Sequence, residues 1–273
     1  MQTIIVKEKI KEIPRMMYKG KLFIAAVLIA ACAFYMGGRS GKEMPVSNII
    51  AAKELPIYCV ETEEKNIAIS FDAAWGDEYT NELLDILKKN NIKATFFMTG
   101  GWVEKYPDSV KRMAAEGHEL GNHSENHKNM SKLSKEENLK EIMDVHNKVK
   151  ELTGQEMNLF RPPYGDYDDE LIKLLNNNKY YPIQWSVDSL DWKNYGADSI
   201  VNTVVNHKAL DDGAIILLHN GAKYTTSALQ AMIDGLKNKG YNFVTIGELI
   251  YKEGYKIDHT GKQIYVGDVK ENQ

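Results

Sequence analysis

The sequence is poor in the features that mark several large classes of protein. It has two cysteines in 273 residues, Cys32 and Cys59, so no disulfide framework is implied. The net charge at neutral pH is only −4, and without an excess of positive charge nothing in the composition favours binding to nucleic acid. No internal repeat or low-complexity segment is visible, so the length fits one large domain with a substantial core.

Long uncharged runs are also rare, and the most conspicuous one lies near the N-terminus. Residues 1–21 carry six lysine or arginine residues and two glutamates, whereas residues 22–38 carry no charge. This run is at the short end for a membrane span, and the basic residues before it predict an N-terminus in the cytoplasm and the rest of the chain outside. A cleaved signal peptide is the alternative, because Ile29-Ala-Ala-Cys32 is similar to a lipoprotein cleavage box. Since the apolar run continues past Cys32 to Met36, we favour an uncleaved transmembrane anchor.

The segments on either side of the main domain are polar. Residues 39–64 contain Gly, Ser, Pro and Glu and are expected to form an extracytoplasmic tether, in which Pro45 and Pro56 discourage a continuous helix. The polar tail, residues 251–273, fits either a short hairpin or a loose segment over the domain. The domain itself is therefore placed at residues 65–250.

Strand-like and helix-like segments alternate within this domain. Seven segments are predicted strands: Ile67–Phe71, Ala94–Met98, His118–Gly121, Asn158–Arg161, Tyr181–Val187, Ala214–Leu218 and Tyr241–Thr245. The predicted helices include Thr80–Lys89, Lys135–Leu152 and Thr225–Lys239, and Gly154 is placed to end the second of these. Alternation of this kind predicts a parallel sheet. Because the domain is shorter than the roughly 250 residues of a full eight-unit barrel, we expect an α/β fold, an incomplete and distorted (β/α) barrel of about seven parallel strands.

Two histidines four residues apart, His123 and His127, are the most informative local feature. On one turn of helix this spacing places both imidazoles on the same side. There they would form half of a divalent-metal site, and zinc accepts such ligands well. A histidine pair in a solvated turn is the alternative, and the pair alone does not decide between the two.

Other reactive side chains lie at or just beyond the ends of predicted strands. Asp72 follows Ile67–Phe71, and His219 follows Ala214–Leu218. Arg161 ends the strand Asn158–Arg161, and Asp191 comes shortly after another predicted strand. Because the carboxyl ends of parallel strands lie at one edge of a sheet, these side chains are expected to build a common site.

The order of these motifs resembles that of a known family. The five motifs of polysaccharide deacetylases with the NodB homology domain, carbohydrate esterase family 4, are similar to Phe71-Asp72, His123-x-x-x-His127, Arg161-Pro-Pro-Tyr-Gly165, Asp191-Trp192 and Leu217-Leu-His219. The stretch from Phe71 to Glu78 most resembles the membrane-anchored, sporulation-associated branch of that family. The resemblance covers about residues 65–250 and implies the same distorted barrel.

The resemblance also implies how the reaction is catalysed. Asp72 would be the general base, which Arg161 can orient and keep ionised by charge pairing. His219 would be the general acid, and the carboxylate of Asp191 can orient it and raise its pKa.

Three further residues are implied to contact the substrate. In the family, the backbone N–H at the position of Tyr164 helps to bind the oxyanion. Trp192 and Leu217 would form the apolar wall against which the acetyl methyl group packs. Ordinary core packing is the alternative for both wall residues.

The sequence departs from the family pattern at the third metal ligand. The usual pattern has two adjacent carboxylates, the base and then a metal ligand, whereas Asp72 is followed by Ala73 and Ala74. Asp77 is the first candidate to supply the missing ligand, and Glu78 is the second. Alternatively, the two histidines and water bind the metal more weakly, or no metal binds and the domain is a degenerate enzyme.

We therefore expect a metal-dependent de-N-acetylase that acts outside the membrane on an N-acetylated cell-wall glycan. Peptidoglycan is the preferred substrate, and zinc is the preferred ion. An O-deacetylase of an acetylated polysaccharide and a degenerate wall-glycan-binding domain are the alternatives. The motifs do not distinguish an ester from an amide.

Overall fold

The computed structural model describes residues 53–267. The predicted anchor at residues 22–38 lies outside these residues. Among the described helices, none is long and apolar enough to span a membrane.

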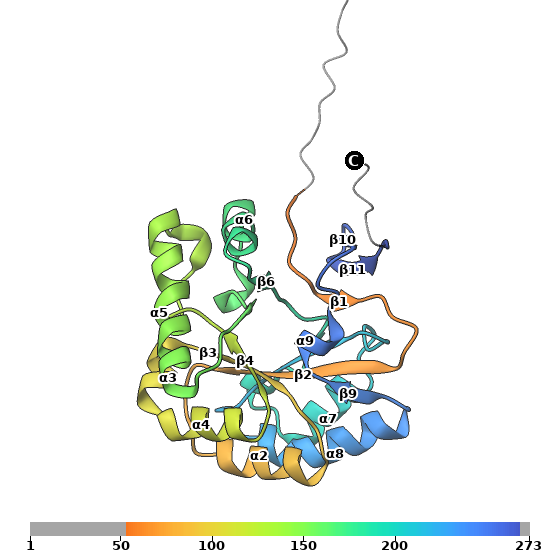
Figure 1. Ribbon diagram of the computed structural model, residues 1–273. Coiled ribbons are helices and arrows are strands. Elements are labelled where there is room, and N and C mark those ends of the chain that lie inside the picture. The colour runs from red at the N-terminus through yellow and green to blue at the C-terminus, as the bar shows by residue number, and fades with distance from the viewer. Residues whose placement is uncertain (1–52, 268–273) are drawn as a thin grey trace, which may run out of the picture. The chain divides into compact units, whose positions relative to one another are not determined.

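A curled parallel sheet forms the centre of the described chain (Figure 1). Its strands are β2 (Asn66–Ala73), β3 (Thr95–Met98), β4 (Glu119–Asn122), β5 (Leu159–Phe160), β6 (Tyr181–Pro182), β7 (Val187–Asp188), β8 (Ile215–His219) and β9 (Asn242–Val244). They lie in the order β6-β5-β4-β3-β2-β8-β7, and β9 also pairs with β2. All of these pairs are parallel. The predicted α/β half-barrel is therefore confirmed.

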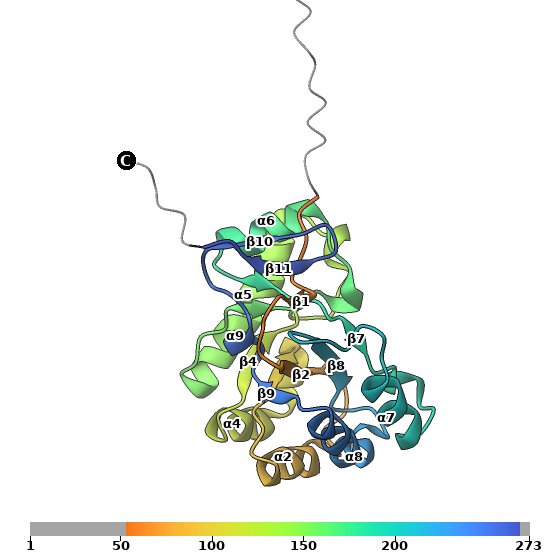
Figure 2. The same cartoon turned by 90° about the vertical axis from the view of Figure 1, so that its right-hand side faces the viewer.

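The helices are α2 (Thr80–Lys89), α3 (Gly100–Lys105), α4 (Pro107–Ala115), α5 (Lys135–Thr153), α6 (Asp169–Asn177), α7 (Ala197–Val205), α8 (Thr225–Asn238) and α9 (Ile246–Leu249). Figure 2 shows α2, α4, α7 and α8 along one side of the sheet. The start of α5 is fixed by a capping box between Ser134 and Glu137, and Gly154 ends it at a φ of +76°, as its position in the sequence predicts.

The alternation of side chains along β2 separates the core from the interior of the half-barrel. Ile67, Ile69 and Phe71 are fully buried in the core cluster that also contains Leu83 and Leu84 of α2. The residues between them point to the opposite face, because successive side chains of a strand alternate. Ser70 and Asp72 therefore lie on the inner face of the curled sheet.

One predicted strand is divided in two. The expected strand Tyr181–Val187 is β6 at one end of the sheet order and β7 at the other, separated by residues 183–186 alone. The segment between them pairs elsewhere: Ile183 bridges Ile57, and the backbone N–H of Gln184 donates to the Ile57 carbonyl at 2.7 Å. A short crossing between the two sheet edges requires that the sheet curl until those edges approach.

The predicted boundaries of the domain also change. Ile57 and Val60 lie within the expected tether, yet they are fully or almost fully buried. Strand β1 (Cys59–Val60) pairs with β11 (Lys262–Tyr265), which pairs in turn with β10 (Tyr255–Ile257). The described part of the tether is thus folded onto the domain, because its apolar side chains have a core to enter. The described part of the tail, residues 251–267, forms a hairpin, which is one of its two expected alternatives.

Candidate active site

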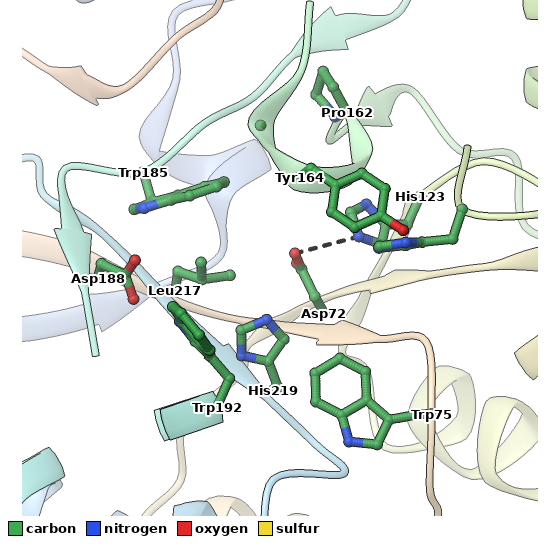
Figure 3. A pocket seen from close by; sticks show the side chains of 12 residues that line it. Asp72, Trp75, His123, Pro162, Tyr164, Trp185, Asp188, Trp192, Leu217 and His219 are labelled. Atoms are coloured by element: carbon green, nitrogen blue, oxygen red, sulfur yellow. Dashed lines mark ion pairs between the residues drawn. The ribbon is translucent and has the colours of Figure 1, made fainter. Parts of the chain in front are cut away.

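Two of the expected strand-end residues, Asp72 and His219, meet in one pocket, and the other two, Arg161 and Asp191, are buried beside them. The cavity measures about 460 Å³ and includes Asp72, His123, His127 and His219 in its lining. Asp72 and His219 are register partners on the neighbouring strands β2 and β8, which explains why residues far apart in the chain face each other. Figure 3 shows Asp72, His123 and His219 around the same space.

Arg161 holds Asp72 in place from the interior of the half-barrel. The Arg161 side chain is completely buried. Its Nη1 donates to Asp72 Oδ1 at 2.7 Å, and its Nη2 donates to Ser70 Oγ at 2.8 Å and to the Gln184 carbonyl at 3.2 Å. The guanidinium also lies over the ring of Phe97, 4.1 Å from the ring centroid. This arrangement leaves Asp72 Oδ2 as the oxygen that can face the pocket.

The charges around Asp72 favour its ionised form. Burial alone would raise the pKa of Asp72, but the Arg161 guanidinium and the nearby His123 and His219 lower it, and the net pKa lies below the ordinary value. Asp72 is therefore ionised at neutral pH, as a general base must be.

Asp191 shifts His219 towards the opposite, protonated state. Its Nδ1 lies 2.7 Å from Asp191 Oδ1, and its backbone N–H donates to Asp191 Oδ2, also at 2.7 Å. Thr225 Oγ1 donates to the same Oδ2 at 2.6 Å. Burial alone would lower the pKa of His219, but the hydrogen bond and charge of Asp191 raise it above its ordinary value. The Nε2 atom is left for the pocket, where a protonated imidazole can serve as an acid.

The two histidines lie side by side, but not on a helix. His123 and His127 are in the loop after β4, and their ring centroids are 4.9 Å apart. The loop reverses through positive φ angles at Ser124 (65°) and His127 (53°), a conformation that is uncommon for non-glycine residues. The predicted proximity is present, whereas the helical turn expected to produce it is wrong.

The donor chemistry around His123 fits a divalent cation. The Arg161 carbonyl, 2.7 Å from Nδ1, can only accept a hydrogen bond, so Nδ1 carries the proton. Burial lowers the pKa of His123 to about 4, so Nε2 is an unprotonated lone pair at neutral pH. It lies 3.5 Å from Asp72 Oδ2, which is also an acceptor. A cation between or beside two facing acceptors stabilises them. In addition, a metal-binding histidine usually donates its other ring N–H to a carbonyl or carboxylate, as Nδ1 does here.

The structure does not bring Asp77 to this pair. Gly76 has a φ of +63° and turns the chain, and the Asp77 carboxylate then accepts a hydrogen bond from Ser109 Oγ of α4 at 3.0 Å. The Asp77 carbonyl accepts the N–H of Thr80 at the start of α2. The carboxylate of Glu78, the second candidate, accepts a hydrogen bond from the backbone N–H of Asp77 at 3.0 Å. Within residues 53–267 no group of three or more histidine, cysteine and acidic side chains is placed to hold a metal ion, so the two histidines fit part of a ligand set.

The expected substrate contacts all line the cavity. Tyr164 is 69% exposed, has a φ of 59°, and its ring lies 4.5 Å from that of His127. Trp192 is half exposed, and Leu217 is 3% exposed, so Leu217 both packs in the core and forms part of the wall.

Three lining residues lie outside the five motifs and were not predicted: Trp75, Trp185 and Asp188. Trp185 lies in the segment that crosses from β6 to β7, and Asp188 lies in β7. The sequence pattern predicts a single strand over most of this region. Trp75 directly follows the motif of Asp72, and that adjacency is the signal that could have found it.

Comparisons with known proteins agree with this geometry. The family model described as polysaccharide deacetylase matches residues 60–183. A peptidoglycan-N-acetylglucosamine deacetylase from Bacillus cereus is 41% identical over 70% of this chain and 91% of that protein. The peptidoglycan-N-acetylmuramic acid deacetylase PdaA from Bacillus subtilis is 33% identical over 80% of this chain and 82% of that protein. A solved structure of a CE4 family pseudoenzyme from Bacillus anthracis matches with a TM-score of 0.69 and 36% identity, over 72% of this chain and 69% of that one.

The resemblance expected from the five motifs is therefore confirmed over most of the domain. The placement in the sporulation-associated branch stays a prediction. Because relatives of 33% and 41% identity are matched over most of their own length, the chain belongs to the polysaccharide deacetylase (NodB) family of hydrolases, carbohydrate esterase family 4.

Proposed function

We propose that this chain is a peptidoglycan N-deacetylase that depends on a divalent metal ion. The observation that carries the proposal is the pair of buried ion pairs at one pocket: Arg161 lies 2.7 Å from Asp72 and lowers its pKa, and Asp191 lies 2.7 Å from His219 and raises its pKa. A domain that only binds glycan needs neither. Two relatives named as peptidoglycan deacetylases support the choice of substrate.

The chain's own residues account for the proton transfers. Asp72 Oδ2 accepts a proton from water, and the water oxygen attacks the carbonyl carbon of the acetamide. The backbone N–H of Tyr164 would stabilise the oxyanion of the tetrahedral intermediate. His219 Nε2 then donates its proton to the amide nitrogen as the C–N bond breaks, so that acetate leaves and the amine stays on the sugar.

A metal ion would be bound beside Asp72. His123 and His127 would hold it through imidazole nitrogens, with zinc as the preferred ion and water in other positions. When bound, such an ion polarises the acetyl carbonyl and makes water a better nucleophile. Asp77 is not part of this proposal, because its carboxylate faces Ser109.

The location of the reaction follows from the N-terminus. A basic segment followed by the uncharged residues 22–38 supports a single-pass anchor with the domain outside the cytoplasm, where peptidoglycan lies. The sporulation-associated branch, suggested by the sequence around Trp75, is part of the same proposal.

A catalytically inactive wall-binding domain is the second candidate. Ala73 occupies the position of the usual carboxylate ligand, and one solved relative is described as a pseudoenzyme. The complete base and acid pairs favour the enzyme.

Acetate release from defined substrates distinguishes these functions. Peptidoglycan, N-acetylglucosamine oligomers and acetylated xylan would be offered to the full chain after chelation, with and without added zinc. We expect zinc-stimulated release from the N-acetylated substrates. Release from xylan alone would indicate an O-deacetylase, and no release from any substrate would indicate the wall-binding domain.

A further inference from the structure

Trp75 has a large aromatic side chain at the pocket and takes no part in the proposed proton transfers. It is 44% exposed and lines the same cavity as Asp72 and His219. Its ring centroid is 5.0 Å from that of His219, with the two planes tilted by 34°. Figure 3 shows Trp75 and Trp192 on opposite sides of His219.

The backbone that carries Trp75 is fixed from two directions. The carbonyl of Gly76 accepts hydrogen bonds from Trp102 Nε1 at 2.7 Å and from Asn220 Nδ2 at 3.3 Å. On the other side, a Cβ atom at Gly221 would lie only 2.1 Å from the Trp75 carbonyl oxygen. The backbone segments at Trp75 and Gly221 are therefore in close contact. On this fixed backbone the indole lies against the His219 ring and is still 44% exposed, so ordering it on binding costs little.

The geometry of the proposed reaction determines what this surface meets. The wall of Leu217 and Trp192 receives the acetyl methyl group on one side of His219. The amine nitrogen, which His219 protonates, remains attached to the sugar. The sugar therefore lies away from the acetyl wall, and Trp75 is the lining aromatic residue on the other side of His219 from Trp192.

We infer that Trp75 binds the glycan by packing its indole against the C–H face of a pyranose ring on the amine side of the scissile bond. An indole combines a large apolar face with a polar edge, which suits a ring that is apolar on its faces and polar around its rim. The inference rests on the proposed function, because that function sets the direction of the substrate in the pocket.

The test measures binding separately from catalysis. The N-acetylglucosamine tetramer would be titrated by calorimetry into the chelator-treated full chain, so that turnover does not interfere. Trp75→Ala is expected to weaken binding by about tenfold, the effect of removing one aromatic anchor, and Trp75→Phe by only about threefold. Tyr195→Ala is the matched control, because Tyr195 is 69% exposed and is not in the pocket lining. It should bind like the unmodified chain.

A second readout separates substrate binding from an effect on the acid. If Trp75 binds sugar, Trp75→Ala raises KM for acetate release and leaves the alkaline limb of the pH–rate profile in place. Unchanged binding by Trp75→Ala, equal weakening by Tyr195→Ala, or a moved alkaline limb with unchanged KM would overturn the inference. If the chain releases no acetate but its tetramer binding depends on Trp75, the proposed catalysis fails and the binding role stands.

Discussion

Replacing Asp72 by asparagine should destabilise the fold as well as stop catalysis. The reason is Arg161, whose guanidinium is completely buried and has Asp72 as its anionic partner at 2.7 Å. Asparagine keeps an oxygen acceptor but removes the negative charge. A buried charge left without its partner costs about 3–5 kcal/mol of unfolding free energy. That is a large part of the roughly 5–15 kcal/mol that stabilises a typical domain.

A neutral contact to the same guanidinium supplies the control. Ser70→Ala removes the Oγ acceptor of Arg161 Nη2 but no charge, and should cost only about 1–3 kcal/mol. Both residues are at most 5% exposed. Because Ser70→Ala also removes the hydrogen bond from Ser70 Oγ to the Ile216 carbonyl, any larger loss in Asp72→Asn reports the lost charge.

The difference between the unmodified chain and Asp72→Asn should also depend on pH. The pKa of Asp72 is lowered in the folded state, so its stabilisation is fully present above the unfolded value of about 3.9 and is lost as the pH falls through the folded pKa. The stability gap should therefore be constant near neutral pH and shrink in acid.

Urea unfolding followed by far-UV circular dichroism, at neutral pH and at a series of acidic values, measures this gap. A neutral-pH difference below about 1 kcal/mol between the unmodified chain and Asp72→Asn would refute the reasoning. So would a gap that does not shrink as Asp72 becomes protonated.

Three further predictions concern other parts of the chain. Asp191 raises the pKa of His219, and the acid works only when it is protonated, so activity falls as the pH rises through that pKa. Asp191→Asn should therefore move the alkaline limb of the pH–rate profile to lower pH. An unmoved limb would count against the pairing. Glu141 of α5 accepts the backbone N–H and the side-chain amide of Asn126 at 2.7 and 2.9 Å, in the loop that carries His127. Glu141→Ala should therefore weaken zinc affinity about tenfold in a metal titration, whereas the exposed Glu136→Ala on the same helix should not. Finally, the full chain should fractionate with membranes and residues 39–273 alone should not; a mature N-terminus at Cys32 would contradict the uncleaved anchor.

Sequence patterns located the elements whose signals are local. Helix α2 begins and ends where its apolar spacing places it, and α5 ends at Gly154. Strands β2 and β8 follow from apolar runs, so the sequence places Asp72 and His219 at strand ends on one edge of the sheet, whereas the pairing of β2 with β8 is visible only in the structure. Their partners Arg161 and Asp191 were found for the same reason, with the family motifs as a guide.

Features that depend on tertiary structure were not accessible in this way. The division of β6 from β7 arises because residues 183–186 cross between opposite edges of the sheet, and nothing in their composition shows this. Asp77 was expected in the pocket because of its charge, but the turn at Gly76 directs it to Ser109 instead. The histidine pair was correctly predicted to be adjacent, although a loop with positive φ angles, and not a helix, brings the rings together.

The most direct test of the central claim is the turnover number for acetate release from peptidoglycan, measured for the full chain and for His219→Ala. Loss of the general acid should lower kcat by roughly 10²–10⁴-fold, with little change in KM, because the acid acts on the breaking C–N bond and not on the bound sugar. Equal turnover by the two proteins, or no release by the unmodified chain with zinc present, would contradict the claim that this pocket is a working deacetylase site.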